Sequence, residues 1–131
     1  MKTDKFLKLC KIVVILAVAL VILLWLLSSC EFGRNYLDEL TIQSPSGKFT
    51  LIIKEWETIG GAGAKIYCTK DGRNSKKLGE IITDDCVLPF HDGNYTLEWK
   101  EDTVVIRYFS GRAGQHTGDP NTWETVRYDL P

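Results

Sequence analysis

An unbroken apolar run close to the N-terminus constrains this chain more than any other feature. Residues 12–27 are 16 apolar side chains in succession, and four lysines precede them within the first 11 residues. Such a run is typical of a helix that enters a bilayer, and basic residues hold its N-terminal end in the cytoplasm. The sequence therefore predicts attachment to the cell membrane, with the C-terminal part outside the cytoplasm.

Two fates of this segment stay open. The uncharged stretch continues through Cys30 and has 19 residues. As a helix it spans roughly 28 Å, about the thickness of the hydrocarbon core, which suits an uncleaved single-pass anchor. The tetrapeptide Leu27-Ser28-Ser29-Cys30 resembles the lipobox of bacterial lipoproteins. The resemblance implies that residues 1–30 hold a signal peptide and that Cys30 is lipidated, and we favour this interpretation. Cys10, on the cytoplasmic side, is a small apolar residue or a palmitoylation site.

The charge and length of the exported part limit its partners and its organisation. From Cys30 onward the chain has 12 basic and 16 acidic residues, a net charge of −4. We expect no nucleic-acid partner, because binding to the phosphate backbone needs a concentrated positive field. The length suits one domain with one core. We assign residues 31–40 to a tether and residues 41–131 to an exported β-rich domain.

The exported part has the pattern of strands separated by turns. All 11 glycines follow residue 32, and no segment keeps a 3.6-residue apolar period over three turns. We predict a mainly β fold, a single small antiparallel sheet or sandwich-like domain after one N-terminal apolar helix. The expected strands are residues 39–43, 48–58, 64–70, 78–83 and 123–130, with a turn at 44–47, a turn or bulge at 60–63 and a short extended piece at 87–90.

The clearest local pattern is a hairpin over residues 94–109. Its first strand alternates apolar and polar residues, as a half-buried strand does, and a second apolar strand follows a short turn. A symmetric turn makes Tyr95 face Tyr108, Leu97 face Ile106 and Trp99 face Val104. All three pairs are apolar, whereas a slip of one residue would put the whole set on the opposite face.

Turn and strand motifs within residues 40–110 carry a resemblance to a known family. The motifs are Ser-Pro-Ser-Gly-Lys-Phe-Thr at residues 44–50, Gly-Gly-Ala-Gly-Ala at 60–64, and Leu-Glu-Trp at 97–99 followed by Val-Val-Ile at 104–106. Their order is similar to that of small membrane-anchored domains of unknown function from Gram-positive bacteria. The resemblance implies an extracytoplasmic β-rich domain on an N-terminal anchor, and it supplies no catalytic residues to transfer.

Catalytic and metal-binding patterns are sparse. His91 and His116 are not at metal-ligand spacing, so we expect neither a metal nor another cofactor. Residues 60–65 lack the ending of a phosphate-binding loop, which favours a turn or a bulge. Cys68 and Cys86 either form a disulfide, closing a loop of about 17 residues and adding roughly 3 kcal/mol of stability, or remain buried thiols on neighbouring strands.

The polar loop over residues 110–121 is the best candidate for a binding site. It has 12 residues and three glycines, more than a strand connection requires. Arg112 is suited to a carboxylate or phosphate, and Trp123, just after the loop, to stacking on a sugar or another ring. The candidate ligand-binding residues are Arg112, Gln115, His116, Asp119 and Trp123. The alternative is a solvated loop that only links two strands.

Two classes of function follow from these patterns. We favour a non-enzymatic module of the cell envelope that is held at the membrane and binds an envelope component, a small ligand or a protein partner. The absence of a nucleophile with an adjacent base in the sequence favours this class. The alternative is an exported hydrolase or other small enzyme that uses Arg112, His116 and Asp119.

Overall fold

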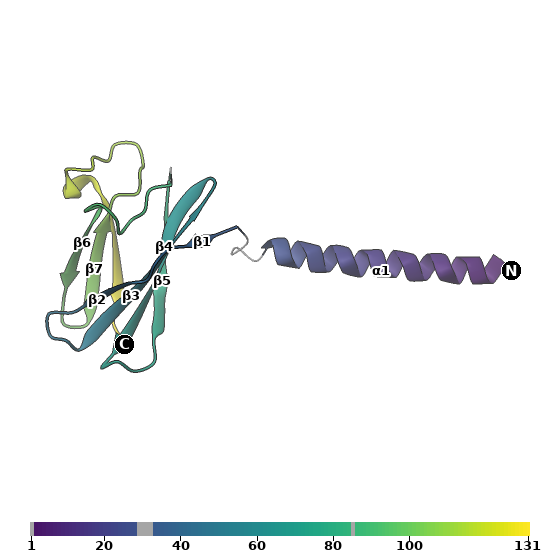
Figure 1. Cartoon of the computed structure of the whole chain (residues 1–131), viewed down its shortest axis with the longest axis horizontal. Helices are drawn as coiled ribbons and strands as arrows, with labels where there is room; N and C mark the ends of the chain where they lie inside the picture. Colours follow the sequence, from purple (N-terminus) through teal and green to yellow (C-terminus); the bar gives the residue numbers. More distant parts are fainter. Residues whose placement is uncertain (1, 29–32, 85) are drawn as a thin grey trace. The chain divides into compact units, whose positions relative to one another are not determined.

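The computed structural model describes residues 2–28, 33–84 and 86–131 (Figure 1). The chain divides into two compact units, Met1–Gly33 and Arg34–Pro131, and each is described by itself. The first unit contains one helix, α1 (Lys2–Ser28), and the second contains all the strands of the described residues.

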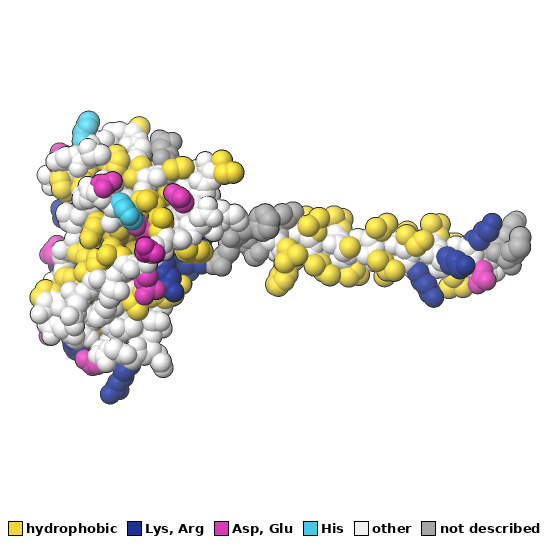
Figure 2. Space-filling model, in the orientation of Figure 1, with side chains coloured by type: hydrophobic (Ala, Val, Ile, Leu, Met, Phe, Trp, Pro, Cys, Tyr) yellow, Lys and Arg dark blue, Asp and Glu magenta, His cyan; other side chains and the backbone are white. Residues whose placement is uncertain are grey.

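Helix α1 is apolar on all sides. Its side chains from Thr3 to Leu26 are exposed, and Figure 2 shows hydrophobic side chains along its length, with lysines near its N-terminal end. A helix of this kind needs apolar surroundings, because water disfavours exposed apolar surface. Thr3–Leu26 has 24 residues, about 36 Å as a helix, which is long and apolar enough to cross a bilayer. A signal sequence near the N-terminus meets the same criteria.

The second unit consists of two antiparallel sheets, which confirms the predicted mainly β fold (Figure 1). In the first sheet, β3 pairs on one side with both β1 and β2 and on the other with β4, which pairs with β5. In the second sheet, β7 lies between β6 and β8. The strands are β1 (Asn35–Tyr36), β2 (Leu40–Gln43), β3 (Phe49–Thr58), β4 (Gly61–Lys70), β5 (Lys76–Thr83), β6 (Tyr95–Trp99), β7 (Thr103–Tyr108) and β8 (Glu124–Asp129), and a short 3-10 helix, η1 (Pro120–Thr122), precedes β8.

The core lies between the two sheets, because alternate residues of each strand point inward. On β3 the residues Phe49, Leu51 and Ile53 are buried, as the sequence pattern predicts. From the second sheet, Val104 and Ile106 are completely buried, and half-buried side chains of β6 and β8 pack against the same cluster. Each sheet therefore buries one face against the other, which is how a small two-layer β domain is stabilised.

The predicted hairpin is confirmed residue by residue. Strand β6 pairs with β7 in the predicted register, with Tyr95 opposite Tyr108, Leu97 opposite Ile106 and Trp99 opposite Val104. The turn at residues 44–47 is confirmed as well, since Gly47 has φ +73° and its N–H donates to the Ser44 carbonyl oxygen at 2.9 Å.

Two boundaries differ from the sequence prediction. Residues 34–40 are not a tether: Asn35 and Tyr36 pair with β3, and the Leu37 N–H donates to the Glu55 carbonyl oxygen at 2.9 Å. Residues 87–90 do not form a strand: after Cys86 with φ +57°, residues 87 and 88 are irregular and residues 89 and 90 lie in a turn. Both segments are short, so their conformations depend on contacts with distant strands that local patterns do not encode.

The glycine-rich stretch also differs from the prediction, because β4 begins at Gly61 and includes most of it. The Trp56 side chain lies so close to Gly63 that a Cβ there would come within 2.6 Å of the indole ring. The Arg34 guanidinium also covers the indole, 3.9 Å from the ring centroid. The small residues of β4 thus make room for a tryptophan that is 4% exposed on the outer side of the sheet.

Candidate functional site

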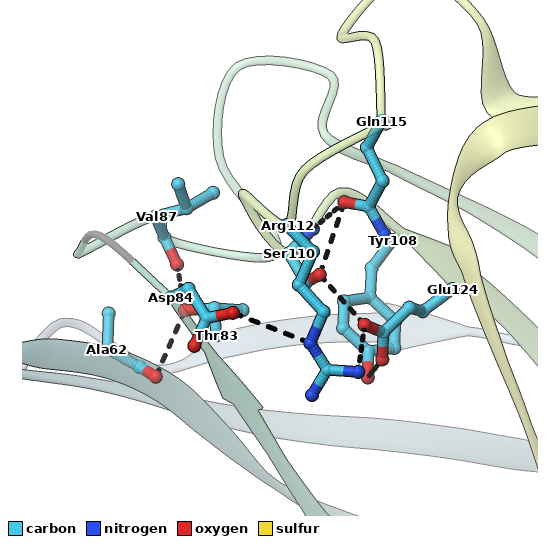
Figure 3. A network of polar contacts seen from close by, with 9 residues as sticks. All are labelled: Ala62, Thr83, Asp84, Val87, Tyr108, Ser110, Arg112, Gln115 and Glu124. Carbon is cyan, nitrogen blue, oxygen red and sulfur yellow. Dashed lines mark hydrogen bonds and ion pairs between the residues drawn. The ribbon is translucent and has the colours of Figure 1, made fainter.

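The predicted binding loop is fixed at its base by the Glu124 carboxylate, at the start of β8 (Figure 3). The Tyr108 hydroxyl donates to Oε2 at 3.0 Å, and the Ser110 hydroxyl lies 2.9 Å from Oε1. The Arg112 Nη1 forms an ion pair with Oε1 at 2.8 Å. One carboxylate therefore joins the end of β7, the start of the loop and the start of β8.

A glutamine closes the loop over this base. The Gln115 Oε1 accepts a hydrogen bond from the Ser110 backbone N–H at 2.9 Å and lies 3.1 Å from the Ser110 hydroxyl. Ser110 is completely buried, so its backbone and side-chain groups need such partners. Figure 3 shows Gln115 and Glu124 on two sides of Ser110.

The loop is also joined to the end of the first sheet. The Asp84 N–H donates to the Ser110 carbonyl oxygen at 2.8 Å, and the Asp84 carboxylate lies 3.4 Å from the Arg112 Nε. Gly111, between them, has φ +82°, and a Cβ there would lie 3.0 Å from the Asp84 carbonyl oxygen. A glycine is therefore required where the loop leaves the sheet, for its backbone conformation and for space.

The tip of the loop is held by its own backbone and side chains. The Trp123 indole N–H donates to the His116 carbonyl oxygen at 2.7 Å, and the His116 N–H donates to the Thr122 hydroxyl at 2.9 Å. The Asp119 carboxylate accepts from the Asn121 N–H at 3.1 Å and so caps helix η1. The loop is thus ordered by contacts within itself as well as by its base.

The electrostatics of the base favour a neutral tyrosine. Burial raises the pKa of the Tyr108 hydroxyl, and its hydrogen bond to the Glu124 carboxylate raises it further. The hydroxyl consequently remains a proton donor to Glu124 throughout the ordinary pH range. The positive Arg112 lies against the same carboxylate and balances its charge.

The structure gives the five predicted ligand-binding residues different roles. Arg112 and Gln115 hold the base of the loop, and Asp119 caps η1. The predicted stacking role of Trp123 is wrong, because its side chain is only 8% exposed and its N–H donates to the His116 carbonyl oxygen. Among the described residues, the side chains of Arg112, His116 and Asp119 make no hydrogen bond or ion pair with one another, and His116 is exposed.

A second polar site, absent from the sequence prediction, is built around Glu55. This residue of β3 is 2% exposed and points inward, in phase with Leu51 and Ile53. Its Oε1 accepts from the Phe90 N–H at 2.7 Å, and its Oε2 lies 2.5 Å from the His91 Nδ1. A buried carboxylate is costly unless it is hydrogen-bonded, and here both oxygens have partners. The signal in the sequence was a charged residue at an inward position of an apolar strand.

The Glu55–His91 pair lies beside a hollow of about 310 Å³. The hollow is lined by this pair, by two leucines and a phenylalanine, and by two exposed acids. The lining residues are Leu37, Asp38, Glu39, Leu40, Glu55, Phe90 and His91. The His91 side chain is 50% exposed, and Figure 2 shows a histidine beside acidic and hydrophobic side chains on the visible face of the domain. When His91 is neutral with its Nδ1 proton directed at Glu55, its Nε2 is a proton acceptor.

The two cysteines of the domain are free thiols, and the proposed disulfide is not formed. Cys68 is completely buried on β4, which raises the pKa of its thiol. Cys86 is exposed and lies against the Thr58 carbonyl oxygen, beyond the opposite end of β4. The seven residue-to-residue steps from Gly61 to Cys68 extend over about 23 Å of strand, far beyond the Cα distance of a disulfide. The alternative prediction, two buried thiols, is confirmed for Cys68 and wrong for Cys86, whose thiol is free but exposed.

Comparison with known proteins adds no assignment, since no family model, curated protein or solved structure matches this chain. The resemblance to the Gram-positive family stays a prediction. Within residues 2–28, 33–84 and 86–131, no group of three or more histidine, cysteine or acidic residues is placed to hold a metal ion.

Proposed function

We propose that this chain is a membrane-attached, extracytoplasmic binding module of the cell envelope without a catalytic role. The apolar helix supports attachment to a membrane, and the lysines before it support an exported C-terminal domain. The compact β domain supports a module that presents loops on a rigid scaffold.

One observation carries the proposal: the loop of residues 110–121 is ordered by a network of its own. Ser110, Gln115 and Glu124 fix its base, while His116, Thr117 and Asp119 are exposed at its tip. A loop that is ordered before binding loses less conformational entropy when a partner arrives. This arrangement favours recognition by a preorganised surface.

Photo-crosslinking in cells tests the proposal. A photoreactive residue replaces Thr117 in one variant of the chain and the exposed Lys70, the last residue of β4, in another. We expect a specific crosslinked species from position 117 only. It should disappear when Gln115→Ala removes the acceptor for Ser110, and persist in the matched variant Gln43→Ala, at the exposed last residue of β2. Crosslinks from position 117 that persist in the Gln115→Ala variant, or that arise equally from position 70, would contradict it.

The orientation of the domain is tested separately, because Cys86 is exposed and Cys10 is on the predicted cytoplasmic side. A membrane-impermeant maleimide should label Cys86 in intact cells, and should label Cys10 only after lysis in chains that keep the N-terminal segment. Labelling of Cys86 only after lysis would place the domain in the cytoplasm and refute the extracytoplasmic part of the proposal.

We also propose lipidation of Cys30, which lies outside the described residues. The support is the small residues before it in Leu27-Ser28-Ser29-Cys30 and the basic, apolar segment that precedes them. Mass spectrometry of the membrane fraction should find a mature chain that begins at a diacylglyceryl-modified Cys30. An intact N-terminal segment with an unmodified Cys30 would favour the uncleaved anchor.

A second candidate function is hydrolysis. The Glu55–His91 pair is a better candidate for its catalytic site than the predicted set of Arg112, His116 and Asp119. A water molecule would attack an ester carbonyl carbon while the His91 Nε2 takes its proton and returns it to the leaving alkoxide. A panel of p-nitrophenyl esters tests this, with His116→Ala as the control. Esterase activity that His91→Ala abolishes and His116→Ala leaves intact would support it, and equal activity in both variants would exclude His91 as the base.

A further inference from the structure

A second hollow, of about 340 Å³, lies at the end of the domain where the β2–β3 and β6–β7 turns meet. Figure 1 shows these two turns at the same end of the two sheets. Its volume lies at the lower end of the range for small-ligand sites. The residues that line it are Ser44, Pro45, Ser46, Lys48, Phe49, Trp99, Lys100 and Glu101.

Trp99 supplies an aromatic surface and an unused hydrogen-bond donor. The indole N–H groups of Trp56 and Trp123 donate to the Glu80 carboxylate and the His116 carbonyl oxygen. The Trp99 N–H has no hydrogen-bond partner among the described residues. Every fully buried side-chain nitrogen or oxygen of these residues has a partner, so the Trp99 nitrogen is not fully buried. The half-buried Trp99 therefore keeps its N–H accessible from outside. Tryptophan with one free edge is well suited to binding ligands that combine a ring with polar groups.

The remaining polar groups are mainly hydrogen-bond donors with positive charge. Lys48 is exposed and has no ion-pair partner among the described residues; its Nζ lies 5.2 Å from the Phe49 ring centroid. Lys100 has only a surface ion pair with Glu98 at 3.4 Å. Glu101 is the single acid in the lining, so the two lysines leave the hollow with a net positive charge.

Two serine hydroxyls complete the lining. The Ser44 hydroxyl accepts from the Phe49 N–H at 3.1 Å and lies 3.1 Å from the Ser46 hydroxyl. This bond fixes Ser44, which is 7% exposed, and leaves Ser46 exposed on the rim. Hydroxyls, an indole N–H and lysines beside an aromatic ring match a ligand rich in acceptor oxygens that also has an apolar face.

We propose that this hollow binds a saccharide that carries a carboxylate or phosphate group. The sugar ring lies against Trp99 and Pro45, its oxygens accept from the Trp99 N–H and the Ser46 hydroxyl, and its anionic group is bound by Lys48. The inference goes beyond the proposed function, whose binding surface is the loop of residues 110–121, and an envelope module outside the cytoplasm would meet charged glycans. The binding itself is a property of the purified chain and does not depend on its orientation in the cell.

Titration of the full ¹⁵N-labelled chain in detergent micelles tests the proposal through the indole cross-peak of Trp99. Four probes distinguish the contribution of the sugar ring from that of the negative charge. They are D-glucuronic acid, D-glucose 6-phosphate, D-glucose and inorganic phosphate. A single ring buries few atoms, so we expect dissociation constants on the order of millimolar. The cross-peak should shift with one or both charged sugars, and the stronger of the two identifies the anionic group. Glucose or phosphate alone should shift it at least about tenfold more weakly.

Two matched variants locate the anion site. Lys48→Gln should weaken binding of the charged sugar at least about tenfold, because it removes a charge-assisted hydrogen bond. Lys54→Gln, six residues and about 20 Å further along β3, should leave it unchanged.

Three results would overturn the inference. They are no shift with either charged sugar, an equal shift with glucose or with inorganic phosphate, and equal weakening by both lysine variants. Maleimide labelling of Cys86 reports on orientation alone, so a failure of the sugar titration is distinguishable from a failure of the proposed extracytoplasmic location.

Discussion

Among the glycines of the described residues, Gly63 is the one whose replacement by alanine should destabilise the domain most. A Cβ at position 63 would lie 2.3 Å from the Ile81 carbonyl oxygen and 2.6 Å from the Trp56 ring. The carbonyl oxygen belongs to the neighbouring strand β5, which is paired with β4 at this point. The indole cannot move freely either, because the Arg34 guanidinium covers it and its N–H donates to the Glu80 carboxylate.

The magnitude follows from these two obstructions. Overpacking of a well-packed site costs about 1–3 kcal/mol, and occasionally more. Here one obstruction is backbone, so we expect the upper end, about 3 kcal/mol, after the small entropic gain from replacing glycine. This is a large share of the stability of a small domain. In guanidinium chloride it corresponds to a decrease of about 1 M in the unfolding midpoint.

Two other glycines make a graded control series. A Cβ at Gly79 would meet the end of the Tyr128 side chain at 2.6 Å, which can rotate away, so we expect about 1–2 kcal/mol. A Cβ at Gly60 would meet nothing within 4 Å, so that change should stay within about 0.5 kcal/mol. The full chain is unfolded in detergent micelles and followed by tryptophan fluorescence. Equal midpoints for Gly63→Ala and Gly60→Ala would refute the packing of Trp56 on Gly63.

Three further predictions concern the core, the base of the loop and the thiols. Ile106→Ala should cost about 2–5 kcal/mol by chemical denaturation, because its side chain is completely buried; an unchanged midpoint would contradict the hairpin packing. Tyr108 has a raised pKa in the folded state, so its contribution to stability is complete below its unfolded pKa of about 10 and is lost as the pH rises through the folded value. Tyr108→Phe should make unfolding midpoints fall less steeply above about pH 10, and an unchanged slope would refute this. Peptide mapping after brief maleimide treatment should find Cys86 modified and Cys68 protected until unfolding; equal modification would place Cys68 at the surface.

Much of the fold could be predicted from local patterns. The alternation along residues 94–100 and the symmetric turn after it are sufficient to give the register of β6 and β7. In the same way, residues 44–50 contain their own turn signal, and Gly47 adopts the positive φ expected there. These predictions succeed because side chains alternate along a strand and a tight turn fixes the register of its two strands.

The candidate site was predicted less well, because its contacts join segments far apart in sequence. Trp123 has an aromatic ring that could stack on a ligand, yet the folding of the loop buries that ring. Glu55 and His91 are 36 positions apart, and nothing local indicates that a strand carboxylate would meet the loop before β6. The polar loop itself was identified, but Arg112 pairs with Asp84 and Glu124 outside the loop, and Asp119 accepts hydrogen bonds from Asn121.

By itself, the sequence determined the properties that depend on neighbouring residues. These are the apolar helix with its preceding lysines, the β character of residues 41–131 and the hairpin register. Only the tertiary structure decided that Gly61 begins a strand, that Cys68 and Cys86 lie apart, and that Trp99 keeps a free N–H. The physical reason is range: strand alternation repeats every two residues, whereas burial, pairing and open donors depend on which distant segments come into contact.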